Sequence, residues 1–171
     1  MSAEIAADSA STLVRARYGI RPPFAIGARV SLSDLLFFTP YGADPTTVEE
    51  VLPHALATQR VRATDKVGIY WEAYNTNPAG EPMTVSLVVA PETTEESGRI
   101  SRAARALRLS RETQPVSLTV QDRSVRGSRT TSRAVELDLS TLTPGDYLVQ
   151  LEIDVAGQYT VRADRRITIV P

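Results

Sequence analysis

The alternation of side chains along residues 146–155 (DYLVQLEIDV) constrains the fold more strongly than any other feature of this sequence. One set of alternate positions carries Tyr147, Val149, Leu151, Ile153 and Val155, and the other carries Leu148, Gln150, Glu152 and Asp154. Because successive residues of a β-strand point to opposite faces of its sheet, this period of two predicts a strand with one buried face.

The same period appears in residues 67–75 (VGIYWEAYN), which contain the only tryptophan of the chain. One face carries Val67, Ile69, Trp71 and Ala73, and the other carries Gly68, Tyr70, Glu72 and Tyr74. We expect the first face in the core, where Trp71 would pack with Val67, Ile69, Tyr147, Val149, Leu151 and Ile153. Turn-forming residues (NTNPAGEP) and an apolar stretch (MTVSLVVAP) follow, which predicts that 67–75 and 83–91 form a hairpin.

Further strand patterns occupy residues 29–38, 60–63, 115–122, 133–140 and 159–170. In the first of them the alternation slips at Ser33–Asp34, which indicates a bulge or an edge bend. Seven or eight strands spaced by turns, with no β-α-β rhythm, predict an all-β protein. The expected fold is an antiparallel β-sandwich.

Two short helices are expected between the strands. Asp44 as N-cap, Pro45 at the first position and Glu49 and Glu50 one turn later predict a helix of one or two turns, which Pro53 would disturb. Residues 98–110 (GRISRAARALRLS) place apolar side chains at helical spacing and arginines on the other faces, which predicts an amphipathic helix.

The chain of 171 residues has room for one domain with a full core. We expect residues 29–171 to form the sandwich and residues 1–28 to form a peripheral or partly disordered N-terminal arm. Within the arm, a short helix around 10–18 is one option. A composition with 42% hydrophobic and 23% charged residues argues against wholesale disorder of the chain.

The stretch LTPGDYLVQLEIDV resembles the penultimate strand of bacterial immunoglobulin-like and fibronectin-like domains. In such domains the tyrosine that opens the strand bonds backbone through its hydroxyl, and Tyr147 is the matching residue. Together with SLSDLLFF and VGIYWEAYN, this stretch also resembles the C-terminal region of bacterial GWxTD-domain proteins, although the motif that names them is absent here. That resemblance implies an exported setting and carries no catalytic residues over.

The residue types present in the chain exclude several kinds of catalytic and metal-binding site. There is no cysteine, which removes disulfides, thiolate nucleophiles and cysteine-based metal sites. His54 is the only histidine, and it follows Pro53 in a connecting segment with no nucleophile-elbow pattern near any serine. No phosphate-cradling glycine motif and no calcium-loop template is present, so we expect no cofactor and no metal.

Tyr70, Glu72 and Tyr74 share one strand face and form a candidate ligand patch. In a binding site their rings would stack on a sugar or peptide while the carboxylate bonds a hydroxyl or a cation. The alternative is an outer sheet face covered by amphipathic rings, or by an inserted segment packed on it. Exposure of the three side chains in a groove would distinguish the two.

Arginines are concentrated in residues 99–133. This segment contains nine arginines and two acidic residues, which gives it a net charge of +7. The candidate interaction residues are Arg99, Arg102, Arg105, Arg108, Arg126 and Arg129. A solvated helix and hairpin tip, a protein partner and an anionic lipid surface remain open as explanations. Nucleic acid is disfavoured because the run has no interleaved aromatic residues for base stacking.

These features favour a non-catalytic interaction or structural module, an accessory part of a larger exported protein or assembly. A periplasmic or otherwise exported location is expected, although the N-terminus has no signal-peptide pattern and no run is long enough to span a bilayer. The alternatives are a carbohydrate- or peptide-binding sandwich and, third, a hydrolase that would need His54 beside a hydroxyl nucleophile or two convergent acids.

Overall fold

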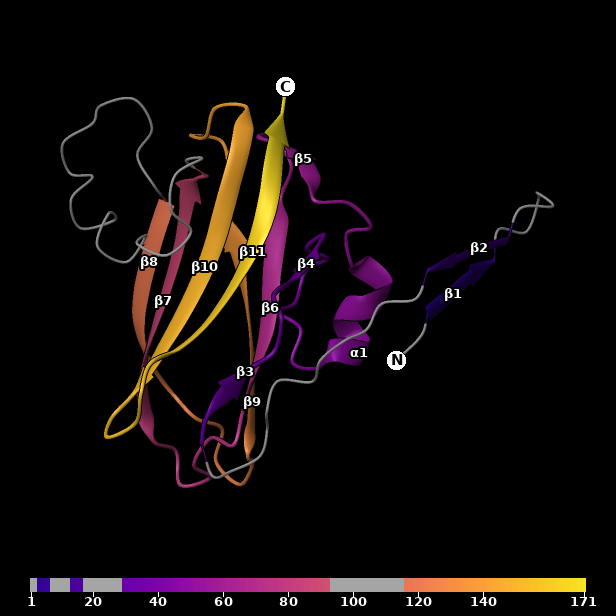
Figure 1. The fold of residues 1–171 in the computed structure, drawn as a ribbon. Helices are drawn as coiled ribbons and strands as arrows, with labels where there is room; N and C mark the ends of the chain where they lie inside the picture. Colours follow the sequence, from indigo (N-terminus) through magenta and orange to yellow (C-terminus); the bar gives the residue numbers. More distant parts are fainter. Residues whose placement is uncertain (1–2, 7–12, 17–28, 93–115) are drawn as a thin grey trace.

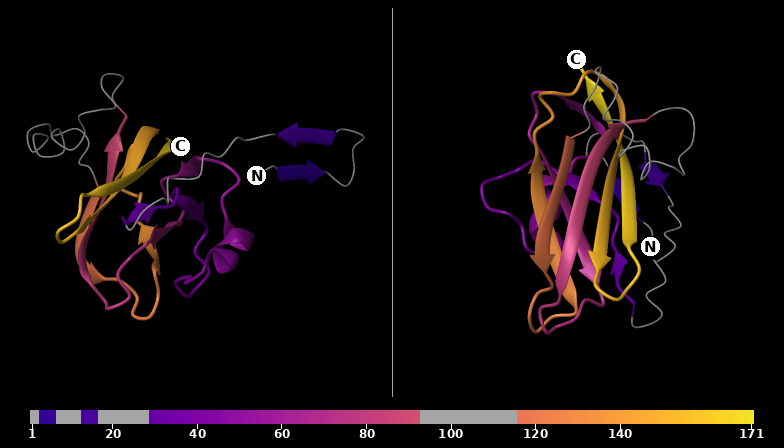
Figure 2. Two further views of the ribbon diagram at one scale, coloured as in Figure 1. Left: turned by 60° about the horizontal axis from the view of Figure 1, so that its bottom comes forward. Right: turned by 90° about the vertical axis from the view of Figure 1, so that its left-hand side faces the viewer.

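The protein is a sandwich of two β-sheets, as expected, in a computed structural model that describes residues 3–6, 13–16, 29–92 and 116–171. Figure 1 shows the two layers, and Figure 2 shows them from two other sides. With its cross-sheet connections and its tyrosine corner, described below, the fold is immunoglobulin-like. Within the described residues, no helix is long and apolar enough to cross a membrane.

The larger sheet has five strands in the order β5-β11-β10-β7-β8. They are β5 (Arg60–Arg62), β7 (Pro82–Pro91), β8 (Val116–Arg123), β10 (Gly145–Val155) and β11 (Val161–Val170). All neighbours run antiparallel except β5, which pairs with β11 in parallel. The expectation of a wholly antiparallel sandwich is therefore wrong at this one edge.

The smaller sheet is built around β6 (Val67–Tyr74), which pairs with β9 (Thr130–Leu137) along its whole length. On its other side β6 pairs with β3 (Ser31–Leu32) and β4 (Leu36–Phe38). Because β3 and β4 follow each other along one edge, this sheet is three strands wide. The sandwich thus has eight strand positions, within the expected number.

The slip in alternation at Ser33–Asp34 is a bulge, as expected. Leu32 faces Ala73 and Leu36 faces Tyr70, so three residues on the edge strand oppose two on β6. The Ser33 hydroxyl accepts a hydrogen bond of 3.0 Å from the N–H of Glu72, while the Ser33 N–H donates to the Glu72 carbonyl. The bulge turns Leu35 into the core, where it is fully buried.

The predicted hairpin between 67–75 and 83–91 is wrong, because β6 and β7 belong to different sheets. The connection from β8 to β9, expected to be a hairpin tip, also crosses from one sheet to the other. Alternation places the apolar faces of both strands in the core, but it does not state whether the strands lie side by side or face each other across it.

The two crossing connections are joined by hydrogen bonds around buried Ser124. Its hydroxyl donates to the carbonyl of Asn77 at 2.6 Å and accepts from the N–H of Glu81 at 2.8 Å. The hydroxyls of Thr76 and Thr131 lie 3.1 Å apart and add a second buried link. These bonds fix how the two sheets are connected at this end.

The first expected helix is present as α1 (Val48–Val51), and it continues as a single 3-10 turn over η1 (Leu52–His54). Its N-cap is Thr47, which forms a capping box with Glu50, so the expected cap at Asp44 is wrong. Pro53 ends the regular helix, as expected. The helix packs Val51 against Phe38 and Tyr70 on the outer face of the smaller sheet.

The core between the sheets holds the side chains that alternation placed there. Trp71 packs with Val67, Ile69, Tyr147, Val149, Leu151 and Ile153, all of them buried. The hydroxyl of Tyr147 donates to the carbonyl of Thr143 at 2.8 Å, which is the tyrosine corner that the sequence predicted.

At the N-terminus, β1 (Ala3–Ala6) and β2 (Leu13–Ala16) pair as an antiparallel hairpin. The option of a helix around 10–18 is therefore wrong, because Leu13–Ala16 is a strand. The predicted amphipathic helix over 98–110 lies outside the described residues, as does most of the predicted arm.

Candidate functional site

The side edge of the sandwich between β8 and β9 carries apolar side chains that the smaller sheet does not cover. Strand β8 pairs with β7 in a register that sets Leu118 opposite Leu87 and Val120 opposite Val85. Directly paired residues point to the same face, so Leu118 and Val120 face the core side of their sheet. They are nevertheless 42% and 40% exposed, whereas Leu87 and Val85 are buried.

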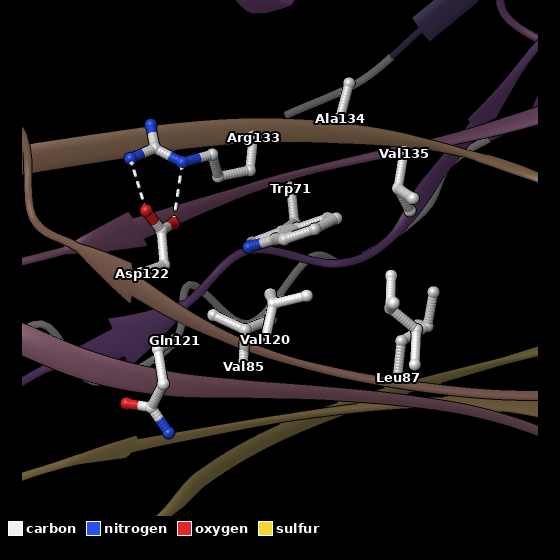
Figure 3. Close-up of a pocket in the computed structure, with 10 residues that line it drawn as sticks. Trp71, Val85, Leu87, Val120, Gln121, Asp122, Arg133, Ala134 and Val135 are labelled. Atoms are coloured by element: carbon white, nitrogen blue, oxygen red, sulfur yellow. Dashed lines mark hydrogen bonds and ion pairs between the residues drawn. The ribbon is translucent and has the colours of Figure 1, made fainter.

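A groove of about 310 Å³ opens at this edge. We call it the edge groove; its lining residues are Trp71, Val85, Leu87, Leu118, Val120, Gln121, Asp122, Arg133, Ala134 and Val135. Figure 3 shows the indole of Trp71 lying across the groove, between the side chains of β8 and β9. The ring is only 5% exposed, so it is both part of the core and the inner wall of the groove.

One end of the edge groove is closed by a bidentate ion pair. Arg133 Nε lies 2.7 Å from Asp122 Oδ2, and Arg133 Nη2 lies 3.0 Å from Asp122 Oδ1 (Figure 3). Partial burial raises the pKa of Asp122, but hydrogen bonds from the Arg133 side chain and the Arg123 N–H outweigh it, and the pKa lies below its ordinary value. The pair joins β8 of one sheet to β9 of the other.

Beyond the ion pair, exposed arginines stand at the end of β8 and in the loop that joins β8 to β9. Arg123 is the last residue of β8, Arg126 and Arg129 lie in the loop, and Val125 in the same loop is also exposed. The stem of Arg126 lies over Gly80, where a Cβ atom would come within 3.1 Å of it. Two of the six predicted interaction residues, Arg126 and Arg129, thus lie in the loop that follows the Asp122 end of the edge groove.

The other four predicted interaction residues are Arg99, Arg102, Arg105 and Arg108, and they lie outside the described residues. The structure brings Arg126 together with Arg123, whose guanidinium donates to the Gly80 carbonyl at 3.2 Å. Arg123 was counted in the basic run but was not chosen as a candidate.

The three side chains of the candidate ligand patch are hydrogen-bonded to one another. Tyr70 donates to Glu72 Oε1 at 2.7 Å, and Tyr74 donates to Glu72 Oε2 at 2.6 Å. Tyr70 is 2% exposed beneath α1, while Glu72 and Tyr74 are half-buried. Burial, followed by the bond to Glu72, raises the pKa of Tyr74 to about 12, and it raises the pKa of Tyr70 as well.

His54 stacks on an aromatic ring and has no hydroxyl or carboxylate partner among the described residues. Its imidazole lies 3.9 Å, centroid to centroid, from the ring of Tyr41, with an angle of 16° between the planes. Among all the residues that the structure describes, no group of three or more histidines and acids is arranged to hold a metal ion.

The edge groove was not predicted from the sequence. The strand expected over 115–122 differs from β8 by one residue at each end, and the strand expected over 133–140 is offset from β9 by three residues. A signal was present: residues 116–121 (VSLTVQ) carry no charge, and an exposed edge strand normally has one. That signal has meaning only once β8 is known to be an edge strand.

No protein-family model matches the chain, and no curated protein matches it. Among solved structures, an immunoglobulin-like protein from Pseudomonas aeruginosa is similar at 15% identity and a TM-score of 0.44, covering 85% of this chain and 100% of that one. The soluble domain of PmoD from Methylocystis is similar at 12% identity and a TM-score of 0.39, covering 80% of this chain and 89% of that one. The resemblance to GWxTD-domain proteins has no counterpart in these comparisons.

Proposed function

We propose that the protein is a non-catalytic interaction module, an accessory part of a larger exported assembly, that contacts a protein partner through the edge groove and the adjacent arginine loop, residues 124–129. The observation that carries this proposal is the exposure of Leu118 and Val120, two apolar side chains on the core side of their sheet.

The composition of this surface resembles that of a protein interface. Apolar side chains and a tryptophan line its centre, and the charged groups of Asp122 and Arg133 lie at one end. Protein interfaces commonly have an apolar centre, a polar rim and an enrichment in arginine and aromatic residues. Exposed arginines next to the groove add the long-range attraction that would orient an acidic partner.

The alternatives receive less support from the geometry. In the candidate ligand patch both carboxylate oxygens of Glu72 already accept from tyrosines, and the ring of Tyr70 lies beneath α1. A sugar or peptide would therefore have to displace two short hydrogen bonds. For a hydrolase, His54 stacks on Tyr41 rather than facing a nucleophile.

The exported setting rests on the resemblance of the sequence motifs, and it belongs to this proposal. An anionic lipid surface is a weaker candidate partner, because it would engage the arginines but would leave the apolar wall of the edge groove, with Trp71 at its base, uncovered.

Affinity purification from the native source tests the proposed function. The wild-type chain should retain one partner chain in constant ratio, and the Leu118→Glu/Val120→Glu variant should lose it. The matched control is Ser117→Glu/Thr119→Glu, which puts the same charges on the opposite, outward face of β8. Equal retention by both variants, or no partner in constant ratio, would rule the proposal out.

A further inference from the structure

We propose that the partner supplies an extended strand that pairs with the free edge of β9, with apolar side chains at alternate positions and an acidic end beside the arginine loop. This inference rests on the proposed function and specifies its partner. The occupant would complete the smaller sheet rather than simply cover a patch.

There is room for a further strand beside β9 because the two sheets differ in width. The larger sheet is five strands wide and the smaller is three, and among the described residues β9 pairs with β6 alone. A further strand would lie about 4.8 Å from β9 and would face the larger sheet at about 10 Å. That position lies over the exposed core-side surface of β8.

Side-chain direction sets the pattern of the incoming strand. In β9, Arg133 and Val135 pair with Trp71 and Ile69 and share their inward face. Every second side chain of a strand added beside β9 would likewise point inward, toward Leu118 and Val120. These inward positions require apolar residues, because an unpaired polar group buried there would be destabilising.

Pairing on β8 instead would not fill the edge groove. A strand added to β8, including β8 of a second copy, would widen the larger sheet and leave its core-side face uncovered over an even greater width. Only a strand in the layer of β9 covers Leu118, Val120 and the Trp71 indole together, so the edge of β9 is the position that removes the most apolar surface from water.

The charges near one end of the groove determine which residue type is favoured at that end of the incoming strand. The Asp122–Arg133 pair neutralises itself at one end of the groove, and the exposed Arg126 and Arg129 follow in the loop just beyond it. A carboxylate on the partner strand would meet these guanidinium groups at that end, with the geometry that arginine and carboxylate favour. The other end of the groove, near Leu118, has no such requirement.

The test uses the full chain and synthetic peptides of about nine residues, the length of an ordinary strand. In the first peptide, Val and Leu alternate with Thr, and two Asp residues stand at the C-terminus. The second peptide carries the two Asp residues at the N-terminus instead. A scrambled peptide groups the apolar residues together. Trp71, the only tryptophan, reports binding by its fluorescence. We expect one alternating peptide to bind with a Kd of about 10–100 µM and the scrambled peptide to bind at least tenfold more weakly.

Variants locate the bound strand. Leu118→Glu should weaken binding about tenfold or more, because the partner would bury an unpaired charge, while the matched control Ser117→Glu should bind like the wild type. The Arg126→Glu/Arg129→Glu variant should lose the acidic peptide and should bind a peptide that ends in lysines instead. Equal affinity for alternating and scrambled peptides would overturn the inference.

Two other occupants are separate outcomes of the same test. Hydrogen exchange of the chain alone is the first check. If residues 98–110 exchange slowly in the wild type and fast in Leu118→Glu, the chain's own segment 98–110 occupies the groove. A dimer seen by light scattering and lost in the same variant would assign it to a second copy. Either result overturns the partner strand, whereas failure of the peptides with retained copurification leaves the proposed function standing.

Discussion

At the scale of single residues, Trp71 connects stability with the proposed function, because its indole belongs to the core and also forms the inner wall of the edge groove. Its neighbours on one side are fully buried, and on the other side lie Leu118 and Val120. A substitution at Trp71 therefore affects both folding and binding, while substitutions at the two β8 residues should affect binding alone.

Replacement of Trp71 by alanine should destabilise the fold by about 3–5 kcal/mol, because a large buried ring leaves a cavity that the surrounding strands fill only in part. Urea denaturation followed by circular dichroism measures the change. Trp71→Phe is the matched control and should cost less, since it keeps an aromatic ring in the same place. A loss under about 1 kcal/mol for Trp71→Ala would contradict the described packing.

Gly68 marks a close approach of the sheet to its own edge strand. A Cβ atom at this position would overlap the ring of buried Phe38. Gly68→Ala should therefore destabilise the protein by about 1–3 kcal/mol, measured by urea denaturation. Combining it with Phe38→Leu should recover part of the loss beyond additivity, because the overlap is with that ring; purely additive losses would argue against the contact.

At the scale of elements, the two connections that cross between the sheets define the topology of the sandwich. Strands β6 and β7 follow each other in sequence but lie in opposite sheets, and the same holds for β8 and β9. Ser124 joins the two connections through both its hydroxyl and its backbone. The edge groove opens beside this junction, so the junction sets the spacing of β8 and β9.

Ser124→Ala should destabilise the protein by about 1–3 kcal/mol, because it leaves the Glu81 N–H without its acceptor and removes the shorter of the two hydrogen bonds to the Asn77 carbonyl, which still accepts from the Gly80 N–H. The free energy of unfolding in urea measures this loss. Ser117→Ala is the matched control on exposed β8 and should change the stability by less than about 0.5 kcal/mol. Similar effects of the two substitutions would show that the Ser124 bonds contribute little.

At the scale of the whole molecule, the unequal sheets determine the shape that a partner meets. Five strands face three, and the core side of β8 is left exposed along one edge. The Asp122–Arg133 pair joins the two sheets across that edge, and it is an inward-facing charged pair of the kind that prevents uncontrolled strand pairing. A partner strand would have to dock beside this pair.

The Asp122–Arg133 pair gives the molecule part of its response to acid. The pKa of Asp122 is lowered in the folded state, so its contribution to stability is present above the ordinary carboxyl pKa of about 3.9 and is lost as pH falls through the lowered value. Asp122→Asn should lower the stability at neutral pH and should flatten its decline on acidification. Urea denaturation at several pH values measures this decline, and a slope equal to that of the wild type would show that the pair contributes little to it.

Local chemistry was enough to predict much of the fold. The two-residue period placed Trp71 and its neighbours in the core, and the slip at Ser33–Asp34 located the bulge. Tyr147 is the corner tyrosine that the motif predicted. Each of these features depends on residues close together in the sequence, where side-chain direction and backbone bonding follow from the order of the chain.

The sequence by itself determined which side chains turn inward, and through them the class of fold. Only the tertiary structure decided which strands are neighbours: it separated β6 from β7, set β5 parallel to β11 and left β8 at an open edge. The physical reason is that alternation defines the two faces of a strand, whereas its pairing partner depends on contacts between residues far apart in the chain. The edge groove exists only through such contacts, so no local pattern could reveal it.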